Sequence, residues 1–173
     1  MNTKKISYLG LLIALAFVLS YVEALLPISI GIPGVKIGLA NLVVMVALYT
    51  IGSKNAFMLS VVRVLLVSLT FGNFAMMLYS MAGALLSFVV MFIAKRSKKF
   101  SITGVSVLGG VFHNVGQIIV AIFVLETSKL VYYLPVLIIV GTITGMVIGL
   151  VAGMIIKRIG GWKDICYGSK SSM

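Results

Sequence analysis

Six long apolar runs occupy most of this chain, and they limit the possible folds more than any other feature. Each run approaches the roughly 20 residues that an α-helix needs to cross a bilayer. The runs cover Ile6–Leu26, Val35–Ile51, Ala56–Phe71, Phe74–Ala94, Val105–Leu125 and Val131–Ile156. The connections between them are too short to hold a soluble domain. We therefore expect an all-α fold, a polytopic membrane bundle of six transmembrane helices over residues 1–160, with a cytoplasmic polar tail over residues 161–173.

The composition excludes the other broad classes of protein. Of the 173 residues, 61% are hydrophobic and only 10% are charged, whereas a soluble domain has about 45–50% and about 25%. A water-soluble monomer and a disordered chain are both excluded. The net charge of +11 would suit nucleic acid, but the basic residues stand at the ends of apolar runs and form no basic face. We expect a lipid bilayer as a partner and no nucleic acid.

The basic residues also predict the topology, because lysine and arginine collect on the cytoplasmic side of a membrane protein. With six spans, most of them fall on one side, namely Lys4, Lys5, Lys54, Lys95, Arg96, Lys98, Lys99, Lys157, Arg158, Lys163 and Lys170. The opposite side has only Lys36 and Lys129. Both termini are therefore expected in the cytoplasm.

Arg63 is the one charged residue expected deep in a span. It lies about 12 Å from the inner end of the third run, at 1.5 Å per residue. An ionisable group near the bilayer centre costs at least ~2.5 kcal/mol, so Arg63 is expected to point into the bundle. It either makes a structural ion pair or carbonyl clamp, or binds an anionic or carbonyl-bearing substrate.

The fifth run has a polar patch at mid-depth, formed by His113, Asn114 and Gln117, which lie about one helical turn apart. A lone histidine cannot complete a tetrahedral metal site, so no metal is expected. Buried amides need hydrogen-bond partners. We expect this patch to face Arg63, Asn41 or both, in one substrate-binding site.

The first connection is rich in proline and glycine between Pro27 and Asn41. Such a segment either folds over the mouth of the bundle as a lid or presents amide groups to a ligand. Glu23 and Lys36 stand at its edges, where they either contact the ligand or pair with each other. Tyr79, at the outer end of the fourth run, is expected to line the same opening.

Small residues mark two helix surfaces. In the last run a glycine recurs every four residues, at Gly141, Gly145, Gly149 and Gly153. Such a groove lets another helix approach closely, and packing within the bundle is the favoured interpretation. In the first run, the small residues Gly10, Ala14 and Ala16 are candidates for contact with the helix of a partner.

Several stretches resemble a known family. They are Glu23 to Pro27, Pro33 to Asn41, Arg63, Ser80 to Ser87, and His113 to Gln117. They resemble the bacterial Gx transporter, or heptaprenyl diphosphate synthase component I, family, which is related in shape to the substrate-binding S components of energy-coupling factor transporters. The resemblance implies six helices in a bacterial cell membrane and an outward-opening ligand pocket under the first loop. It also implies a first helix that meets a transmembrane coupling subunit working with ATPases.

The synthase name conflicts with the acidic residues of the chain. Prenyl diphosphate synthases hold magnesium with clusters of aspartates, but here the only acids are Glu23, Glu126 and Asp164. We therefore expect no enzyme activity of that type and no cofactor. A phosphate loop for ATP hydrolysis is also missing from the sequence.

The favoured function is a binding and transport subunit for a small amphipathic or anionic compound, dependent on energy-coupling partners. One alternative is a membrane accessory protein of isoprenoid or quinone metabolism. The other is a bundle without a ligand, in which Arg63 has a structural role.

Overall fold

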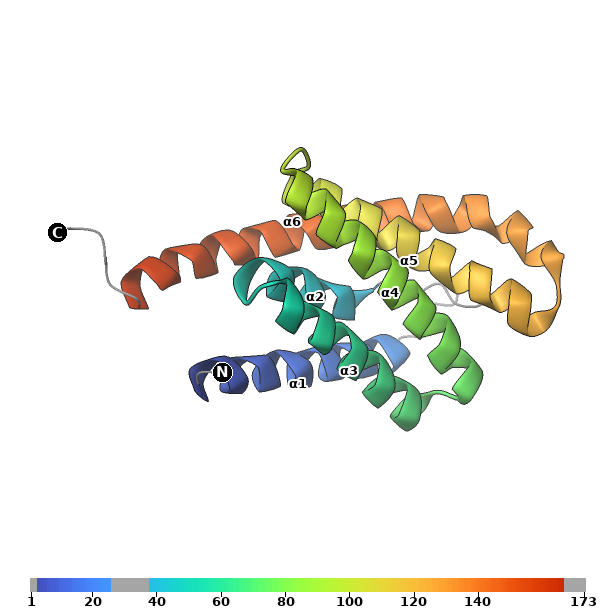
Figure 1. The fold of residues 1–173 in the computed structure, drawn as a ribbon, viewed down its shortest axis with the longest axis horizontal. Coiled ribbons are helices and arrows are strands. Elements are labelled where there is room, and N and C mark those ends of the chain that lie inside the picture. Colours follow the sequence, from blue (N-terminus) through green and yellow to red (C-terminus); the bar gives the residue numbers. More distant parts are fainter. Residues whose placement is uncertain (1–2, 26–37, 167–173) are drawn as a thin grey trace.

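The computed structural model describes residues 3–25 and 38–166, and its regular structure there is entirely helical (Figure 1). Six α-helices and one short 3₁₀-helix follow one another as α1 (Thr3–Leu25), α2 (Leu39–Thr50), α3 (Ser53–Phe71), α4 (Phe74–Ser97), α5 (Ile102–Leu125), η1 (Ser128–Tyr133) and α6 (Leu134–Cys166). Five of them are long and apolar enough to cross a membrane. The predicted all-α membrane bundle of six helices is confirmed.

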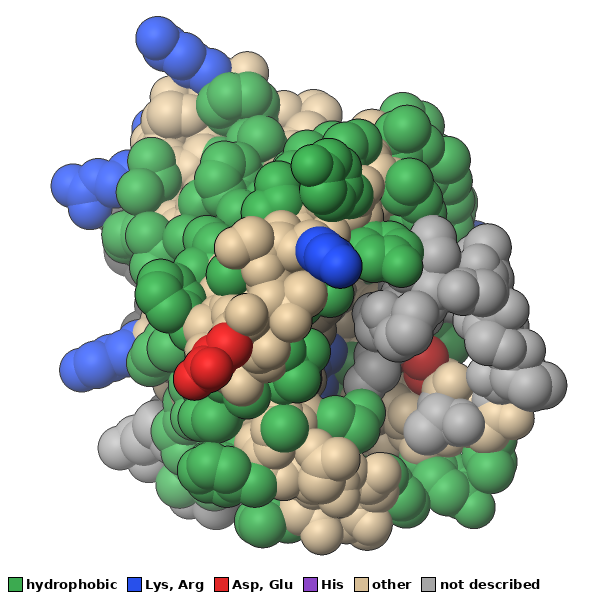
Figure 2. Space-filling view, turned by 90° about the vertical axis from the view of Figure 1, so that its right-hand side faces the viewer, with side chains coloured by type: hydrophobic (Ala, Val, Ile, Leu, Met, Phe, Trp, Pro, Cys, Tyr) green, Lys and Arg blue, Asp and Glu red, His purple; other side chains and the backbone are tan. Residues whose placement is uncertain are grey.

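The long helices expose large apolar side chains on the outside of the bundle, including Leu69 and Phe123, which are each 78% exposed. Viewed from the end that carries η1, hydrophobic side chains cover much of the periphery (Figure 2). This arrangement is stable only where lipid replaces water around the helices. The first turn of α1 and the last turns of α6 lie toward the same end, opposite η1 (Figure 1), as the predicted topology requires.

Helix α2 differs from the other five. It has 12 residues and is therefore about 18 Å long, against a hydrocarbon core of about 30 Å. The predicted second run was longer, but Gly38 stands before the helix with φ 77°, in the left-handed region that glycine adopts without strain. The described helix is therefore shorter than the predicted run Val35–Ile51, and α2 covers only part of the apolar depth.

Other helices of the protein surround α2. It contacts α1, α3 and α6, and seven of its residues are buried, including every one from Val43 to Leu48. A helix that is apolar on all sides and this short is suited to the centre of a bundle. Its backbone is therefore covered by protein, and the core of the molecule forms around Met45, Leu48 and Leu59.

Helices α4, α5 and α6 approach one another closely at glycines. A Cβ atom added to Gly110 of α5 would lie 2.5 Å from the carbonyl oxygen of Gly141 in α6. One added to Gly116 would lie 2.8 Å from the carbonyl oxygen of Ala82 in α4. The Ser87 hydroxyl also donates to the Gly109 carbonyl over 2.8 Å. These contacts fix α5 between its two neighbours.

The C-terminal helix continues beyond the predicted end of its apolar run. The run ends at Ile156, whereas α6 continues to Cys166, so the first residues assigned to the polar tail extend the helix. The polar residues after Ile156 suit the part of a helix that lies outside the bilayer. An apolar run shows where a helix leaves the lipid, but it does not show where the helix ends.

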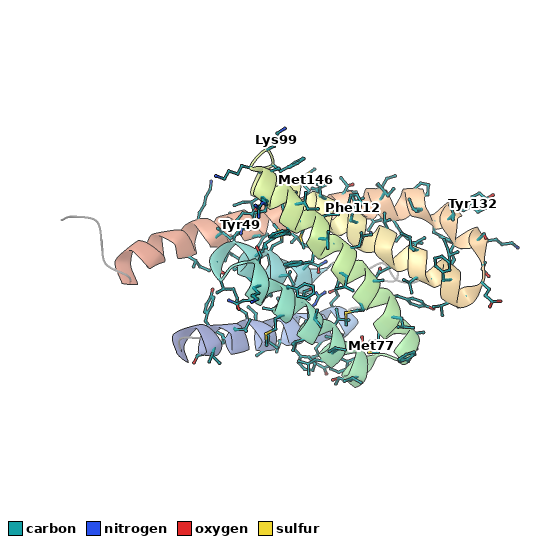
Figure 3. The ribbon with its side chains drawn as sticks, viewed as in Figure 1. Tyr49, Met77, Lys99, Phe112, Tyr132 and Met146 are labelled. Carbon is teal, nitrogen blue, oxygen red and sulfur yellow. The ribbon has the colours of Figure 1, made fainter. Side chains whose placement is uncertain are left out.

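The C-terminal end of α2 is bound by a cation from α4. The Lys95 ammonium donates to the Leu48 carbonyl over 2.5 Å and lies 4.7 Å from the centroid of the Tyr49 ring (Figure 3). The last carbonyls of a helix have no partner within it and carry partial negative charge. Lys95 therefore holds the C-terminal end of α2 in place.

We expect Lys95→Met to lower the free energy of unfolding by about 1–2 kcal/mol, because methionine keeps the apolar stem but loses the charge at the helix end. The measurement is the melting temperature of the protein in lipid nanodiscs. Lys99→Met is the control, since Lys99 is exposed beside the α4–α5 turn (Figure 3). Equal melting temperatures for the two variants would contradict this role of Lys95.

Candidate functional site

The candidate site lies at the N-terminus of α2, inside the bundle. A Cβ atom added to Gly38 would lie 3.3 Å from Cδ1 of Ile148 in α6. Along α6, Ile148 is about 13 Å from Lys157 and about 21 Å from Leu134, so α2 begins near the middle of the apolar depth. The first N–H groups of a helix have no acceptors within it, and they give this end partial positive charge.

Glu23, from the last turn of α1, supplies an acceptor for one of these groups. The Gly38 N–H donates to Oε1 of Glu23 over 2.5 Å. The Asn41 N–H donates to the Gly38 carbonyl over 2.8 Å, which tightens the first turn. The Asn41 amide nitrogen is 3.4 Å from the position of a Cβ on Gly38. A carboxylate, a helix N-terminus and an amide therefore lie together.

Arg63 adds a full positive charge to this group. It lies near the middle of α3, about 15 Å from Ser53, and its side chain is only 8% exposed. The structure gives its guanidinium no hydrogen bond and no ion pair within 4.0 Å to a residue it describes, but the Glu23 carboxylate acts on it electrostatically. Arg63 faces the interior, as expected, and its guanidinium carries five hydrogen-bond donors.

The polar residues of α5 lie along two seams of that helix. The Asn114 amide donates to the Leu137 carbonyl over 2.7 Å, so Asn114 joins α5 to α6 and is not directed at Arg63. A Cβ on Gly83 would lie 3.1 Å from the His113 ring and 2.8 Å from Cγ of Gln117, which places both side chains beside α4. For Asn114, the expectation of one shared site with Arg63 is therefore corrected.

Two other predicted site residues are less informative. Lys36 lies outside the described residues, as does most of the loop from Pro27. Tyr79 is half-buried in the second turn of α4, two residues after Met77, which marks this end of the helix in Figure 3. The described contacts do not join Tyr79 to Glu23 or Arg63.

The small residues are divided between inner and outer faces. Gly145 and Gly149 pack on the backbone of α5, and Gly141 packs on Gly110, whereas Gly153 has open space. On α1, Ala16 is fully buried, while Gly10 and Ala14 are exposed. Of these three α1 residues, Gly10 and Ala14 thus face outward.

Sequence analysis missed two parts of this arrangement. Gly38 sets the start of α2 at mid-depth, but it stands between Ile37 and Leu39 and does not interrupt the apolar run. Its signal was a glycine at the edge of a helical pattern. The contact of Lys95 with the C-terminal end of α2 could not be found from a local sequence pattern, because its partner Leu48 is 47 residues away.

The chemistry of the site is that of anion recognition. An arginine fork and a helix N-terminus both bind carboxylates or phosphates. Among residues 3–25 and 38–166, no three His, Cys, Asp or Glu side chains come together as metal ligands.

Fold and site together define an integral membrane protein with a polar site inside an apolar helical bundle. The family model for heptaprenyl diphosphate synthase component I matches residues 12–155, and the chain belongs to this family. The match includes Glu23, Gly38 and Arg63. No curated protein and no solved structure matches the chain in the same comparisons.

Proposed function

We propose that this protein is the substrate-binding subunit of a membrane transport system, with a small amphipathic or anionic compound as its substrate. The observation that carries the proposal is the burial of Arg63 in the middle of α3, where the Glu23 carboxylate that caps α2 acts on it electrostatically. A charge at this depth costs at least ~2.5 kcal/mol. A buried guanidinium that makes no hydrogen bond to a described residue, near a capped helix N-terminus, favours binding of an anion from outside.

The surroundings of the site support an amphipathic substrate. Ile148 lies against Gly38, and α2 behind it is buried and apolar. Sites for small molecules combine apolar walls with a few convergent polar groups. A short helix whose N-terminus points at an anionic group is also a recurrent device of membrane transporters. His113 and Gln117 remain candidates for further polar contacts.

Energy for transport has to come from other proteins, because the chain has no phosphate loop. We propose a transmembrane coupling subunit and ATPases as partners, in a bacterial cell membrane. The outward face of α1 around Gly10 and Ala14 suits contact with a partner helix, since small residues let helix backbones approach closely.

The family description favours a second candidate function, a membrane accessory protein of heptaprenyl diphosphate metabolism. In that case the bundle holds a prenyl chain among its helices or anchors a soluble prenyltransferase. The family description names a component of a synthase and does not by itself assign catalysis to this chain.

Native mass spectrometry of the protein, extracted gently from its own host, separates the two candidates. The transport proposal predicts co-purifying ATPase and coupling subunits. Co-purification with a prenyltransferase instead would overturn it in favour of the accessory role. A Gly10→Leu/Ala14→Leu variant is the control, because the larger side chains block the outward face of α1. The variant should lose the coupling subunit but stay folded, since both residues are exposed.

A further inference from the structure

Glu23 occupies the position that an anionic ligand would take. Its carboxylate accepts the Gly38 N–H at the start of α2, where a helix binds anions most strongly. Its charge also acts on Arg63. A carboxylate is therefore already bound at the one place in the described bundle where a helix N-terminus and a buried arginine act on the same group.

Among the residues that the structure describes, the hydrogen bonding of the site is incomplete. Arg63 is more than nine-tenths buried and makes no hydrogen bond to the described residues, although its guanidinium has five donors. A carboxylate placed between Arg63 and the α2 N-terminus would receive a bidentate pair from the arginine as well as the helix N–H groups. Glu23, fixed to α1, uses the helix N–H but makes no ion pair with Arg63.

We propose that Glu23 is a tethered occupant of a carboxylate-binding site, and that the carboxylate of the substrate displaces it from the α2 N-terminus. The proposal deepens the proposed function, on which it rests, by naming the substrate class and the competitor built into the site. Binding then requires the last turn of α1, which carries Glu23, to release the first turn of α2. The substrate carboxylate takes over the Gly38 N–H and engages Arg63.

Chemical rescue tests this assignment with acetate as the probe. Glu23→Ala leaves a space for a free carboxylate beside Gly38. In nanodiscs at constant ionic strength, sodium acetate in place of chloride should raise the melting temperature of Glu23→Ala saturably, by about 3–6 °C at ten times the apparent Kd. The wild type, with its site filled, should not respond.

The double variant Glu23→Ala/Arg63→Gln is the matched control. A glutamate that only caps α2 would give acetate rescue whether or not Arg63 is present, because the helix N-terminus remains. A site shared with Arg63 predicts that rescue is lost in the double variant. Rescue of equal size in both variants, or no rescue in Glu23→Ala, overturns the proposal.

Glu23→Gln provides a second measurement that does not depend on a truncated side chain, since glutamine keeps the shape of glutamate. It removes the competing charge, so decanoate, a carboxylate on an apolar tail, should bind at least tenfold more tightly than to the wild type. Decanamide, the uncharged analogue, should bind both proteins alike. Equal decanoate affinities overturn the proposal. None of these measurements needs a transport partner. If the protein binds decanoate as predicted but co-purifies with no transport subunit, the proposed transport function is refuted and the role of Glu23 stands.

Discussion

Gly145→Ala is expected to lower the melting temperature by about 6–12 °C, although alanine is normally the better helix former. The added Cβ would lie 2.7 Å from Cα of Val107 and 2.9 Å from the carbonyl oxygen of Ser106. Both atoms belong to the backbone of α5, so the clash is relieved only if α5 and α6 separate. Overpacking of this kind costs about 3 kcal/mol.

Gly153→Ala is the matched control, two turns further along the same face of α6. A Cβ there would meet nothing within 4 Å, so the variant should be unchanged or more stable by up to about 1 kcal/mol, from the helix propensity of alanine. The measurement is thermal unfolding of both variants in nanodiscs. Equal melting temperatures would show that the glycines of α6 do not set the distance between the two helices.

The second large effect is expected at Arg63. Arg63→Gln removes the guanidinium but keeps a polar side chain, and we expect substrate binding to weaken by about 30- to 1,000-fold, or about 2–4 kcal/mol, the cost of truncating one partner of a buried charge pair. Arg63→Lys should also bind more weakly, because an ammonium cannot form the two parallel hydrogen bonds of an arginine fork.

Stability should respond differently from binding. Since the guanidinium makes no hydrogen bond to the described residues, Arg63→Gln should change the melting temperature by no more than about 3 °C, an effect worth about 1 kcal/mol. A structural arginine predicts the opposite pair of results, a clear loss of stability with unchanged binding. The two measurements on one variant therefore separate a ligand-binding role from the ligand-free bundle.

The sequence predicts the long helices well, because hydropathy reports how each segment meets lipid. The predicted ends at Phe71 and Leu125 and the predicted start at Phe74 coincide with the structure. The chain turns between α3 and α4 at Asn73, whose side chain accepts the Met76 N–H over 2.8 Å. The starts of α3 and α5 were placed three residues late, because Ser53 to Asn55 are polar and because Thr103 and Gly104 interrupt the apolar run after Ile102.

Helix α2 could not be delimited in this way. Its flanking residues Ile37 and Leu39 are apolar, so the left-handed Gly38 between them leaves the hydropathy unchanged. Only the backbone conformation shows that a helix begins there, at mid-depth. The burial of α2 by α1, α3 and α6 depends on tertiary packing, which no pattern within the segment reports.

The sequence pointed to two residues of the candidate site, Arg63 and Glu23, but not to their contacts. The cost of a charge at membrane depth identifies Arg63 as an interior residue, and Glu23 was recognisable as one of very few acids. Their relation arises because α1, α2 and α3 pack together, which brings Glu23 to Gly38 across 15 residues. For Asn114, packing has the opposite result: its amide donates to the Leu137 carbonyl of α6 and so lies at the contact between α5 and α6.

The central claim is that Arg63 belongs to a binding site for an anionic small molecule. The most direct test is mass spectrometry of small molecules released from the protein after gentle purification from its own host, comparing the wild type with Arg63→Gln at equal folded amounts. We predict a compound with a carboxylate or another anionic group that is retained by the wild type and lost from Arg63→Gln. Identical small-molecule contents, with Arg63→Gln markedly less stable, would contradict the claim.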